Sequence, residues 1–138
     1  MKISIIYNSH TGTTKGFADA MGRYLNEKGA ETMVGSIDSY DKEFMESADL
    51  VLLGSWTSGL FFFAQHPDRP WHYFAERMPA ITEKKVALFT TYKLATGSMF
   101  RKMEKKLRGK INAPEAILKS KSRMLTAEHK SILDGLTS

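Results

Sequence analysis

The hydrophobic positions of the chain follow two alternating patterns. Five short runs are rich in β-branched and other apolar residues, which is typical of strands that are buried on both faces of a sheet. The predicted strands are residues 2–7, 31–37, 49–54, 85–91 and about 116–124. Between these runs, apolar residues recur three or four positions apart, which indicates helices that bury one face. The pattern therefore predicts a strand followed by a helix, repeated five times.

The ends of the helices can be predicted from residues that favour them. The first helix carries apolar residues at helical spacing from Phe17 to Leu25, and Gly29 supplies its C-terminal stop. In the fourth helix, Met99, Phe100, Met103 and Leu107 are expected to face inward. The expected caps and first residues are Asp38 or Ser39 for a short second helix, Pro70 for a third helix through residue 78, Ser98 for the fourth helix and Thr126 for a last helix to residue 136.

Alternation of this kind specifies a parallel sheet with helices on both faces. We therefore expect an α/β fold, a three-layer α/β/α sandwich, formed by a single domain over residues 1–138. In an open parallel sheet, ligands bind beyond the carboxyl ends of the strands, where the strand order reverses. The loops to inspect are residues 8–14, 55–69 and 91–98, and the second of these is predicted to be a long irregular loop.

Composition narrows the possible chemistry. The 138 residues contain no cysteine, which excludes disulfides, thiolate catalysis, and zinc or iron–sulfur sites with cysteine ligands. The four histidines lack the spacing of metal ligands with acidic companions, and no nucleophile–base arrangement stands out, so we expect neither a metal site nor a catalytic residue. The chain starts without a signal-peptide core and has no apolar run that could cross a bilayer, which favours a cytoplasmic location.

The segment between the first strand and the first helix has the composition of an anion site. Ser9, Thr11, Thr13 and Thr14 offer hydroxyl groups in a short loop, and Gly12 permits a backbone conformation that other residues resist. The first N–H groups of the following helix have no internal partners, and the helix dipole favours negative charge beside them. The Walker and Rossmann spacings are absent, so a triphosphate or a dinucleotide is not favoured. The alternative interpretation is an ordinary helix start that is rich in serine and threonine.

The run Ser9-x-Thr11-Gly12-x-Thr14 after a first strand resembles the FMN-phosphate loop of flavodoxins. The five β/α units resemble that family along nearly the whole chain. The resemblance implies a sheet order of 2-1-3-4-5 and a one-electron carrier between redox partners, rather than an enzyme with its own substrate pocket. It also implies FMN as the cofactor, with its phosphate bound by Ser9, His10, Thr11, Gly12, Thr13 and Thr14.

Two further loops would clasp the isoalloxazine ring of FMN. Trp56 is the first choice for a stacking residue, because indole and flavin are both large flat surfaces. By the resemblance, Gly59 lies beside N5 of the flavin, with Gly54 as the alternative, and Tyr92 covers the opposite face of the ring. Both aromatic residues could instead pack against the core. The cofactor-binding residues expected in these loops are Ser55, Trp56, Thr57, Ser58, Gly59, Thr91, Tyr92 and Gly97.

Two features depart from the flavodoxin pattern. Phe61, Phe62 and Phe63 form a continuous aromatic run, which is either buried under the next helix or available for docking. Typical flavodoxins are acidic, whereas this chain has a net charge of +5 and many cations between Lys93 and Lys110. Positive charge near a reduced flavin raises its potential, and Lys93 lies in the predicted flavin loop. The charge indicates redox partner proteins with an acidic docking surface, and no nucleic-acid motif accompanies it.

Two other functions stay open at this stage. A small FMN-dependent quinone or flavin oxidoreductase at a membrane surface would account for the aromatic run and the basic charge. A flavin-free interaction module would keep the fold alone. We expect no transmembrane segment and a monomer or weak dimer, and peripheral contact with a membrane stays open.

Overall fold

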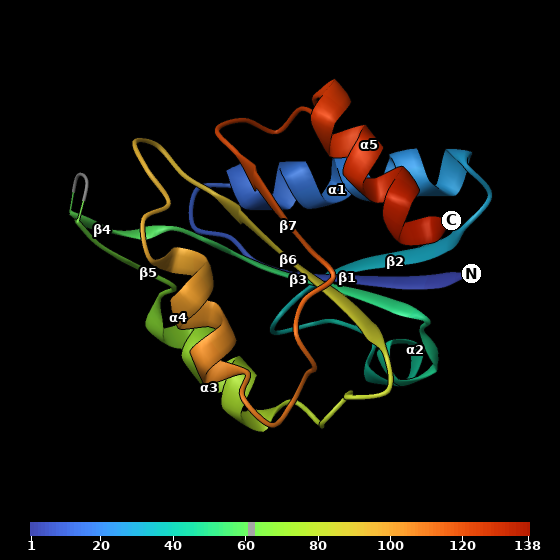
Figure 1. Ribbon diagram of the computed structural model, residues 1–138, viewed down its shortest axis with the longest axis horizontal. Helices are drawn as coiled ribbons and strands as arrows, with labels where there is room; N and C mark the ends of the chain where they lie inside the picture. The colour runs from blue at the N-terminus through green and yellow to red at the C-terminus, as the bar shows by residue number, and fades with distance from the viewer. Residues whose placement is uncertain (61–62) are drawn as a thin grey trace.

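The computed structural model describes the backbone of residues 1–60 and 63–138 and the side chains of residues 1–58 and 66–138. Its main sheet has five parallel strands in the order β2-β1-β3-β6-β7 (Figure 1). Counted without the small hairpin described below, this is the order 2-1-3-4-5, so the predicted fold class is confirmed. The strands of this sheet are β1 (Lys2–Asn8), β2 (Glu31–Ser36), β3 (Leu50–Trp56), β6 (Lys85–Thr91) and β7 (Ala116–Ser120).

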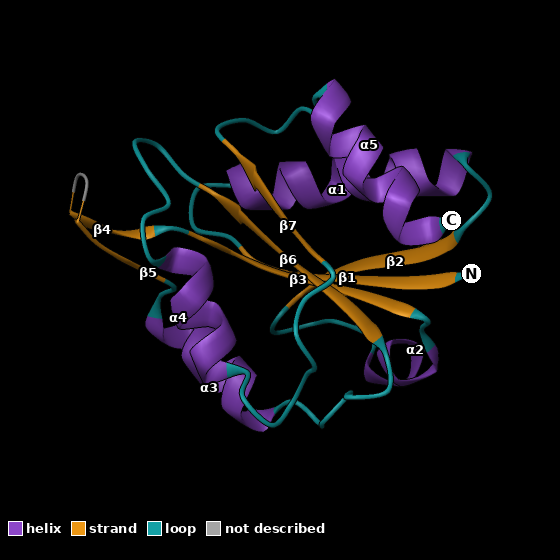
Figure 2. Ribbon diagram, viewed as in Figure 1, coloured by secondary structure: helices purple, strands orange, loops and turns teal. Residues whose placement is uncertain are grey.

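Helices cover both faces of the sheet. Figure 2 shows α1 (Thr13–Glu27) and α5 (Ala127–Thr137) on one side, and α2 (Lys42–Ser47), α3 (Arg69–Arg77) and α4 (Met99–Lys106) on the other. This three-layer arrangement follows from the parallel sheet, because each crossover between parallel strands must pass over one of its faces.

The two layers of helices enclose two separate apolar cores. On the side of α1 and α5, Ile3 and Ile5 of β1 pack with Phe17 and Phe89. On the other side, Ile6 packs in a cluster that includes Trp71 of α3. Neighbouring positions of a strand point to opposite faces, so a strand covered on both sides is apolar on both, as Leu50, Val51, Leu52 and Leu53 of β3 are.

The predicted N-cap positions Ser98 and Thr126 are confirmed, whereas the cap of α2 was predicted wrongly, and Pro70 is the second residue of α3 and not its first. Thr126 caps α5: its hydroxyl accepts from the N–H of His129 at 3.2 Å, and the His129 ring accepts from the N–H of Thr126 at 3.0 Å. The predicted caps of α2, Asp38 and Ser39, were wrong. Asp41 caps this helix, and its carboxylate accepts from the N–H of Phe44 at 2.9 Å.

The prediction of one long irregular loop over residues 55–69 was wrong. β3 continues to Trp56, and an antiparallel hairpin follows, formed by β4 (Ser58–Leu60) and β5 (Phe63–His66). The hairpin projects from the carboxyl end of the main sheet (Figure 1). Phe61 and Phe62 lie outside the described residues, and the side chain of Phe63 lies outside the described side chains. Whether this aromatic run is buried or available for docking therefore stays a prediction.

The last strand of the sheet is shorter than predicted. β7 ends at Ser120, whereas the sequence pattern extends to about residue 124. Beyond Ser120 the chain forms hydrogen bonds within residues 120–124 instead of pairing with the sheet, and in one of them the Ser120 hydroxyl accepts from the N–H of Ser122 at 3.1 Å.

Among the helices of the described residues, none has the length and apolar character needed to cross a membrane.

Candidate functional site

The three loops singled out from the sequence meet at the carboxyl ends of β1, β3 and β6. There they enclose a cavity of about 380 Å³. In a doubly wound sheet this is the expected place for a ligand, since the strand order reverses between β1 and β3. The residues that line the cavity are His10, Thr11, Thr13, Thr14, Trp56, Thr57, Ser58, Thr91, Tyr92, Lys93, Leu94 and Lys121.

The loop after β1 is shaped by Ser9 and Gly12. The Ser9 hydroxyl accepts from the N–H of Gly12 at 3.1 Å and from the N–H of Lys15 at 3.3 Å. Gly12 has φ of 93°, a left-handed conformation that costs glycine little, and it is the residue that precedes α1. Ser9 and Gly12 therefore hold the loop in shape, while Thr11 and Thr13 form the wall of the cavity.

Donors for an anion remain at the start of α1. Within the described part of the chain, the N–H groups of Thr13 and Thr14 have no hydrogen-bond acceptor, and the first turn of α1 contains no acidic residue. The Lys15 ammonium is directed along the helix to Asp19 at 2.8 Å, and this hydrogen bond raises the pKa of Lys15. Free N–H groups at the positive end of a 15-residue helix form an anion site.

Trp56 forms the aromatic wall of the cavity and is fixed by Asp68. The indole Nε1–H donates to Oδ2 of Asp68 at 3.1 Å, and the other carboxylate oxygen accepts from the side-chain amide of Asn8. The indole stacks on the ring of His10, with centroids 4.7 Å apart and planes inclined by 24°. Trp56 therefore already presents a face to a flat ring within the cavity.

Hydroxyl groups tie the loops to the sheet. Thr14 and Thr91 share a buried hydrogen bond of 2.6 Å, which joins the start of α1 to the end of β6. Thr90 donates to the carbonyl of Ser55 at 2.6 Å and shares a bond of 2.7 Å with Thr57. These hydroxyls are satisfied by the protein, so they fix the positions of the walls.

Tyr92 and two lysines complete the third side of the cavity. The N–H of Tyr92 donates to the carbonyl of Ser120 at 3.0 Å, which anchors the loop to the end of β7. The ammonium of Lys121 lies 5.6 Å from the centroid of the Tyr92 ring, within the range of a cation–π interaction. Lys93 also lines the cavity, so the cavity is bordered by two cations, Lys93 and Lys121.

The structure brings most of the predicted cofactor-binding residues together. Nine of them line the cavity: His10, Thr11, Thr13, Thr14, Trp56, Thr57, Ser58, Thr91 and Tyr92. Among the described residues, Ser9, Gly12, Ser55 and Gly97 do not line it. Gly59 lies in β4, and its predicted contact with the flavin stays a prediction.

Sequence reasoning missed the contact that positions Trp56. Asp68 is the N-terminal cap residue of α3, and it is the only acidic residue between positions 55 and 69. The other residues of this segment are uncharged or basic, and the presence of one carboxylate among them was the sequence feature that could have identified Asp68. Lys121 was missed as well, because β7 was predicted to run through its position.

Gly54 has a packing role that is independent of any ligand. A Cβ built at Gly54 would lie 2.2 Å from Cε2 of Phe89, the residue beside it on β6. The Phe89 ring is fully buried and occupies the space that a side chain at position 54 would need. Gly54 therefore permits the close approach of Phe89.

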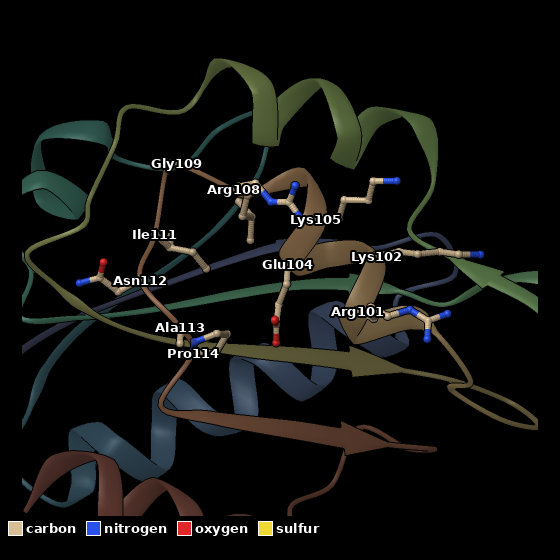
Figure 3. A pocket seen from close by; sticks show the side chains of 11 residues that line it. Arg101, Lys102, Glu104, Lys105, Arg108, Gly109, Ile111, Asn112, Ala113 and Pro114 are labelled. Atoms are coloured by element: carbon tan, nitrogen blue, oxygen red, sulfur yellow. The ribbon is translucent and has the colours of Figure 1, made fainter.

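A second hollow lies along α4, away from the three loops. This α4 groove has a volume of about 660 Å³ and is larger than the first cavity (Figure 3). Its lining includes Arg101, Lys102, Glu104, Lys105 and Arg108. Among the described residues, its lining contains no aromatic side chain, so it offers no stacking surface for a flat ring despite its size.

The fold and the first cavity define the class of protein. An open parallel sheet with an anion site after β1 and aromatic walls at the next two carboxyl ends is a mononucleotide-binding α/β domain. A family model described as a flavodoxin domain matches residues 4–123, so the chain belongs to the flavodoxin domain family.

Individual relatives agree with this assignment. The chain is 25% identical to the flavodoxin of Clostridium beijerinckii over 107 residues, which cover 78% of this chain and 76% of the relative. The two-electron reduced flavodoxin of Megasphaera elsdenii has a similar structure, with a TM-score of 0.74, 19% identity, and coverage of 97% of each chain. Oxidised flavodoxin 1 from Bacillus cereus has a TM-score of 0.69 and 23% identity, covering 96% of this chain and 92% of its own.

The family assignment carries its general function. The protein is an FMN-binding electron-transfer protein, and it passes electrons between partner proteins. The predicted cofactor and the predicted general function are therefore confirmed. Among the described residues, no group of three or more histidines and carboxylates lies together that could hold a metal ion.

Proposed function

We propose that FMN binds in the 380 Å³ cavity, with its phosphate at the start of α1 and its ring against Trp56. The observation that carries the proposal is that the two kinds of group FMN needs border one cavity. Within the described residues, the N–H groups of Thr13 and Thr14 have no acceptor, and the indole of Trp56, which stacks on the His10 ring, lines the same cavity.

The residues present fit the cofactor. The cavity lies within the range of about 300–1,000 Å³ that is typical of small-molecule sites. Its hydroxyl and N–H donors suit a phosphate monoester, and its aromatic side chains suit an isoalloxazine ring. Asp68 would keep the indole of Trp56 in one orientation, and the anchored N–H of Tyr92 would keep the third loop in place.

FMN, when bound, supplies the capacity to accept and release electrons one at a time. The chain's own residues bind the cofactor, orient its ring and set the charge around it. Lys93 and Lys121 place positive charge at the cavity and so stabilise an anionic occupant. This arrangement differs from the acidic surroundings that are typical of the family. We therefore expect reduced FMN to be more stable here, relative to oxidised FMN, than it is in an acidic flavodoxin.

The first prediction concerns cofactor binding. Protein freed of cofactor and titrated with FMN is expected to quench FMN fluorescence with a stoichiometry of one FMN per chain, and to give a perturbed visible spectrum, because the ring leaves water for an aromatic wall. Fluorescence titration and absorbance measure both effects. A titration in which neither signal changes at FMN concentrations up to the millimolar range would contradict the proposed site.

For the redox partner, we propose that an acidic surface docks on the α4 groove. Arg101, Lys102, Lys105 and Arg108 line it, with Glu104 as the one carboxylate among the described lining residues. Figure 3 shows Arg101 and Lys102 extending away from α4, and Glu104 pointing toward the side lined by Pro114. Within the described residues, none of the four cations forms an ion pair, so all are free for a partner. α4 begins directly after the third loop of the proposed cofactor cavity, so one continuous segment joins the cavity to this surface.

The second prediction tests this surface by charge reversal. The variant R101E/K105E is expected to bind a fluorescent poly-glutamate peptide about tenfold more weakly than the wild type at low ionic strength, because complementary charge is replaced by repulsion. Fluorescence anisotropy at several salt concentrations measures the effect, which should shrink as salt increases.

The matched control reverses two exposed cations on the opposite face of the sheet. R23E/K130E on α1 and α5 makes the same change in net charge, and its loss of affinity should be clearly smaller. Equal losses in the two variants would mean that net charge alone attracts the peptide, and would overturn the assignment of the α4 groove.

A further inference from the structure

The side chain of Arg123 lies across the first turns of α1. A Cβ built at Gly16 would lie 2.6 Å from both Cδ and Cγ of Arg123 and 2.9 Å from its Cβ. The Nη2 atom of Arg123 reaches Gly12, where it would lie 3.5 Å from a built Cβ. The aliphatic part of the arginine therefore rests on the surface that Gly16 leaves open, and its guanidinium lies at the residue that precedes the helix.

The backbone that carries Arg123 is held in place by the turn after β7. The Ser120 hydroxyl donates to the carbonyl of Ser122 at 2.9 Å and accepts from the N–H of the same residue at 3.1 Å. The Ser122 hydroxyl accepts from the N–H of Met124 at 3.1 Å. These bonds fix the residues on both sides of Arg123, so its direction toward α1 is built into the turn.

The charge of Arg123 lacks a counterion within the described part of the chain. No carboxylate lies within ion-pair distance of its guanidinium there, and the first turn of α1 contains no acidic residue. The nearest acidic group along α1, Asp19, is paired with Lys15. A cation beside the positive end of a helix dipole is unfavourable by itself, whereas an anion bound between the two is stabilised by both.

We propose that Arg123 contacts the phosphate of FMN and makes the phosphate a major determinant of cofactor affinity in this chain. This inference rests on the proposed position of FMN, and it adds a contact from outside the loop after β1. Guanidinium groups bind phosphate oxygens through two parallel N–H bonds, which are stronger than bonds between neutral groups. Gly16 is then the residue that makes room for the arginine to reach its place.

The test compares FMN with riboflavin, which has the same ring and no phosphate. R123Q is expected to raise the Kd for FMN about tenfold or more, because a hydrogen bond to a charged group is lost. The Kd for riboflavin is expected to stay the same as in the wild type. Fluorescence titrations at fixed ionic strength measure both constants, and R23Q, at an exposed position of α1 outside both cavities, is the matched control, for which neither constant should change.

A second variant reaches the same contact by another route. G16A is expected to displace the Arg123 side chain and to weaken FMN binding by a similar factor. The new methyl group would also press on the turn, because it would lie 2.9 Å from Cβ of Arg123, so FMN affinity is measured well below the melting temperature of the variant. In the R123Q background, G16A is expected to have little further effect on FMN affinity, because the contact is already gone. A structural role for Arg123 alone would lower the melting temperature and would not distinguish FMN from riboflavin.

The failure of this inference can be told apart from the failure of the proposed site. If wild-type protein binds neither FMN nor riboflavin, the site itself is wrong. If wild-type protein binds FMN tightly and R123Q binds it equally well, the site stands and the arginine contact is overturned. Inorganic phosphate at constant ionic strength supplies an independent readout, since it should compete with FMN in the wild type and more weakly in R123Q.

Discussion

Replacing Gly54 with alanine is expected to lower the free energy of unfolding by about 3 kcal/mol, near the upper end for an overpacked core position. A Cβ at this position would lie 2.2–2.3 Å from three carbons of the Phe89 ring, which is fully buried. Gly54 lies in β3 between β1 and β6, so neither strand can move aside without breaking ladder hydrogen bonds. The melting temperature should fall by roughly 10 °C, measured by circular dichroism.

Two further variants make this prediction specific. G135A in α5 is the control, because a Cβ there meets nothing within 4 Å, and it should raise stability by about 0.5–1 kcal/mol. Adding F89L to G54A should recover part of the loss by making space for the new methyl group. A G54A variant as stable as the wild type would show that Phe89 does not pack against this backbone.

The same variant separates two roles for Gly54. If Gly54 acts only in packing, G54A at a temperature where it is folded should bind FMN with nearly the affinity of the wild type. A large loss of FMN affinity without loss of stability would instead support the alternative in which Gly54 lies beside the flavin. Titration with FMN well below the melting temperature measures the difference.

Replacing Trp56 with alanine is expected to raise the Kd for FMN by about tenfold to a hundredfold. Stacking of a flat base on an aromatic side chain contributes about 1–3 kcal/mol, and each 1.4 kcal/mol corresponds to a factor of ten. The indole lines the cavity, is held by Asp68 at 3.1 Å and already stacks on His10 at 4.7 Å. Flavin fluorescence titration measures the Kd, and it should change for FMN and riboflavin alike, unlike the effect of R123Q.

Trp56 also offers a matched control. W56F keeps an aromatic face but loses the N–H that donates to Asp68, so its loss of FMN affinity should be smaller than that of W56A. Both variants should stay folded, because Trp56 is only partly buried, whereas Trp71 lies in the core. If W56A binds FMN as tightly as the wild type, the flavin ring does not stack on this residue.

Charge distinguishes this flavodoxin from the acidic type. The cations near the cofactor cavity and in the α4 groove come from three separate segments, around Lys93, along α4 and around Lys121. Their proposed roles differ, since those at the cavity act on the cofactor and those on α4 act on the partner. The variants described above separate these roles, because R123Q acts on the phosphate alone and R101E/K105E leaves the cofactor cavity intact.

The sequence by itself determined the sheet, the helices and the loop after β1. Each of these depends on local patterns: a run of β-branched residues, apolar residues at helical spacing, or a glycine among hydroxyl residues at a helix start. The strand order came from the resemblance to flavodoxins, and the cap at Thr126 came from a residue type with a strong local preference.

Only the tertiary structure decided the hairpin after β3, the end of β7 and the contacts that position the site. Asp68 meets Asn8 across 60 positions of the chain, and Arg123 meets Gly16 across more than a hundred. No local pattern encodes such pairs, because they exist only after the sheet has brought the carboxyl ends of its strands together. The sequence therefore indicated most of the residues that line the cavity, whereas the contacts between distant segments around it depend on the packing of the fold.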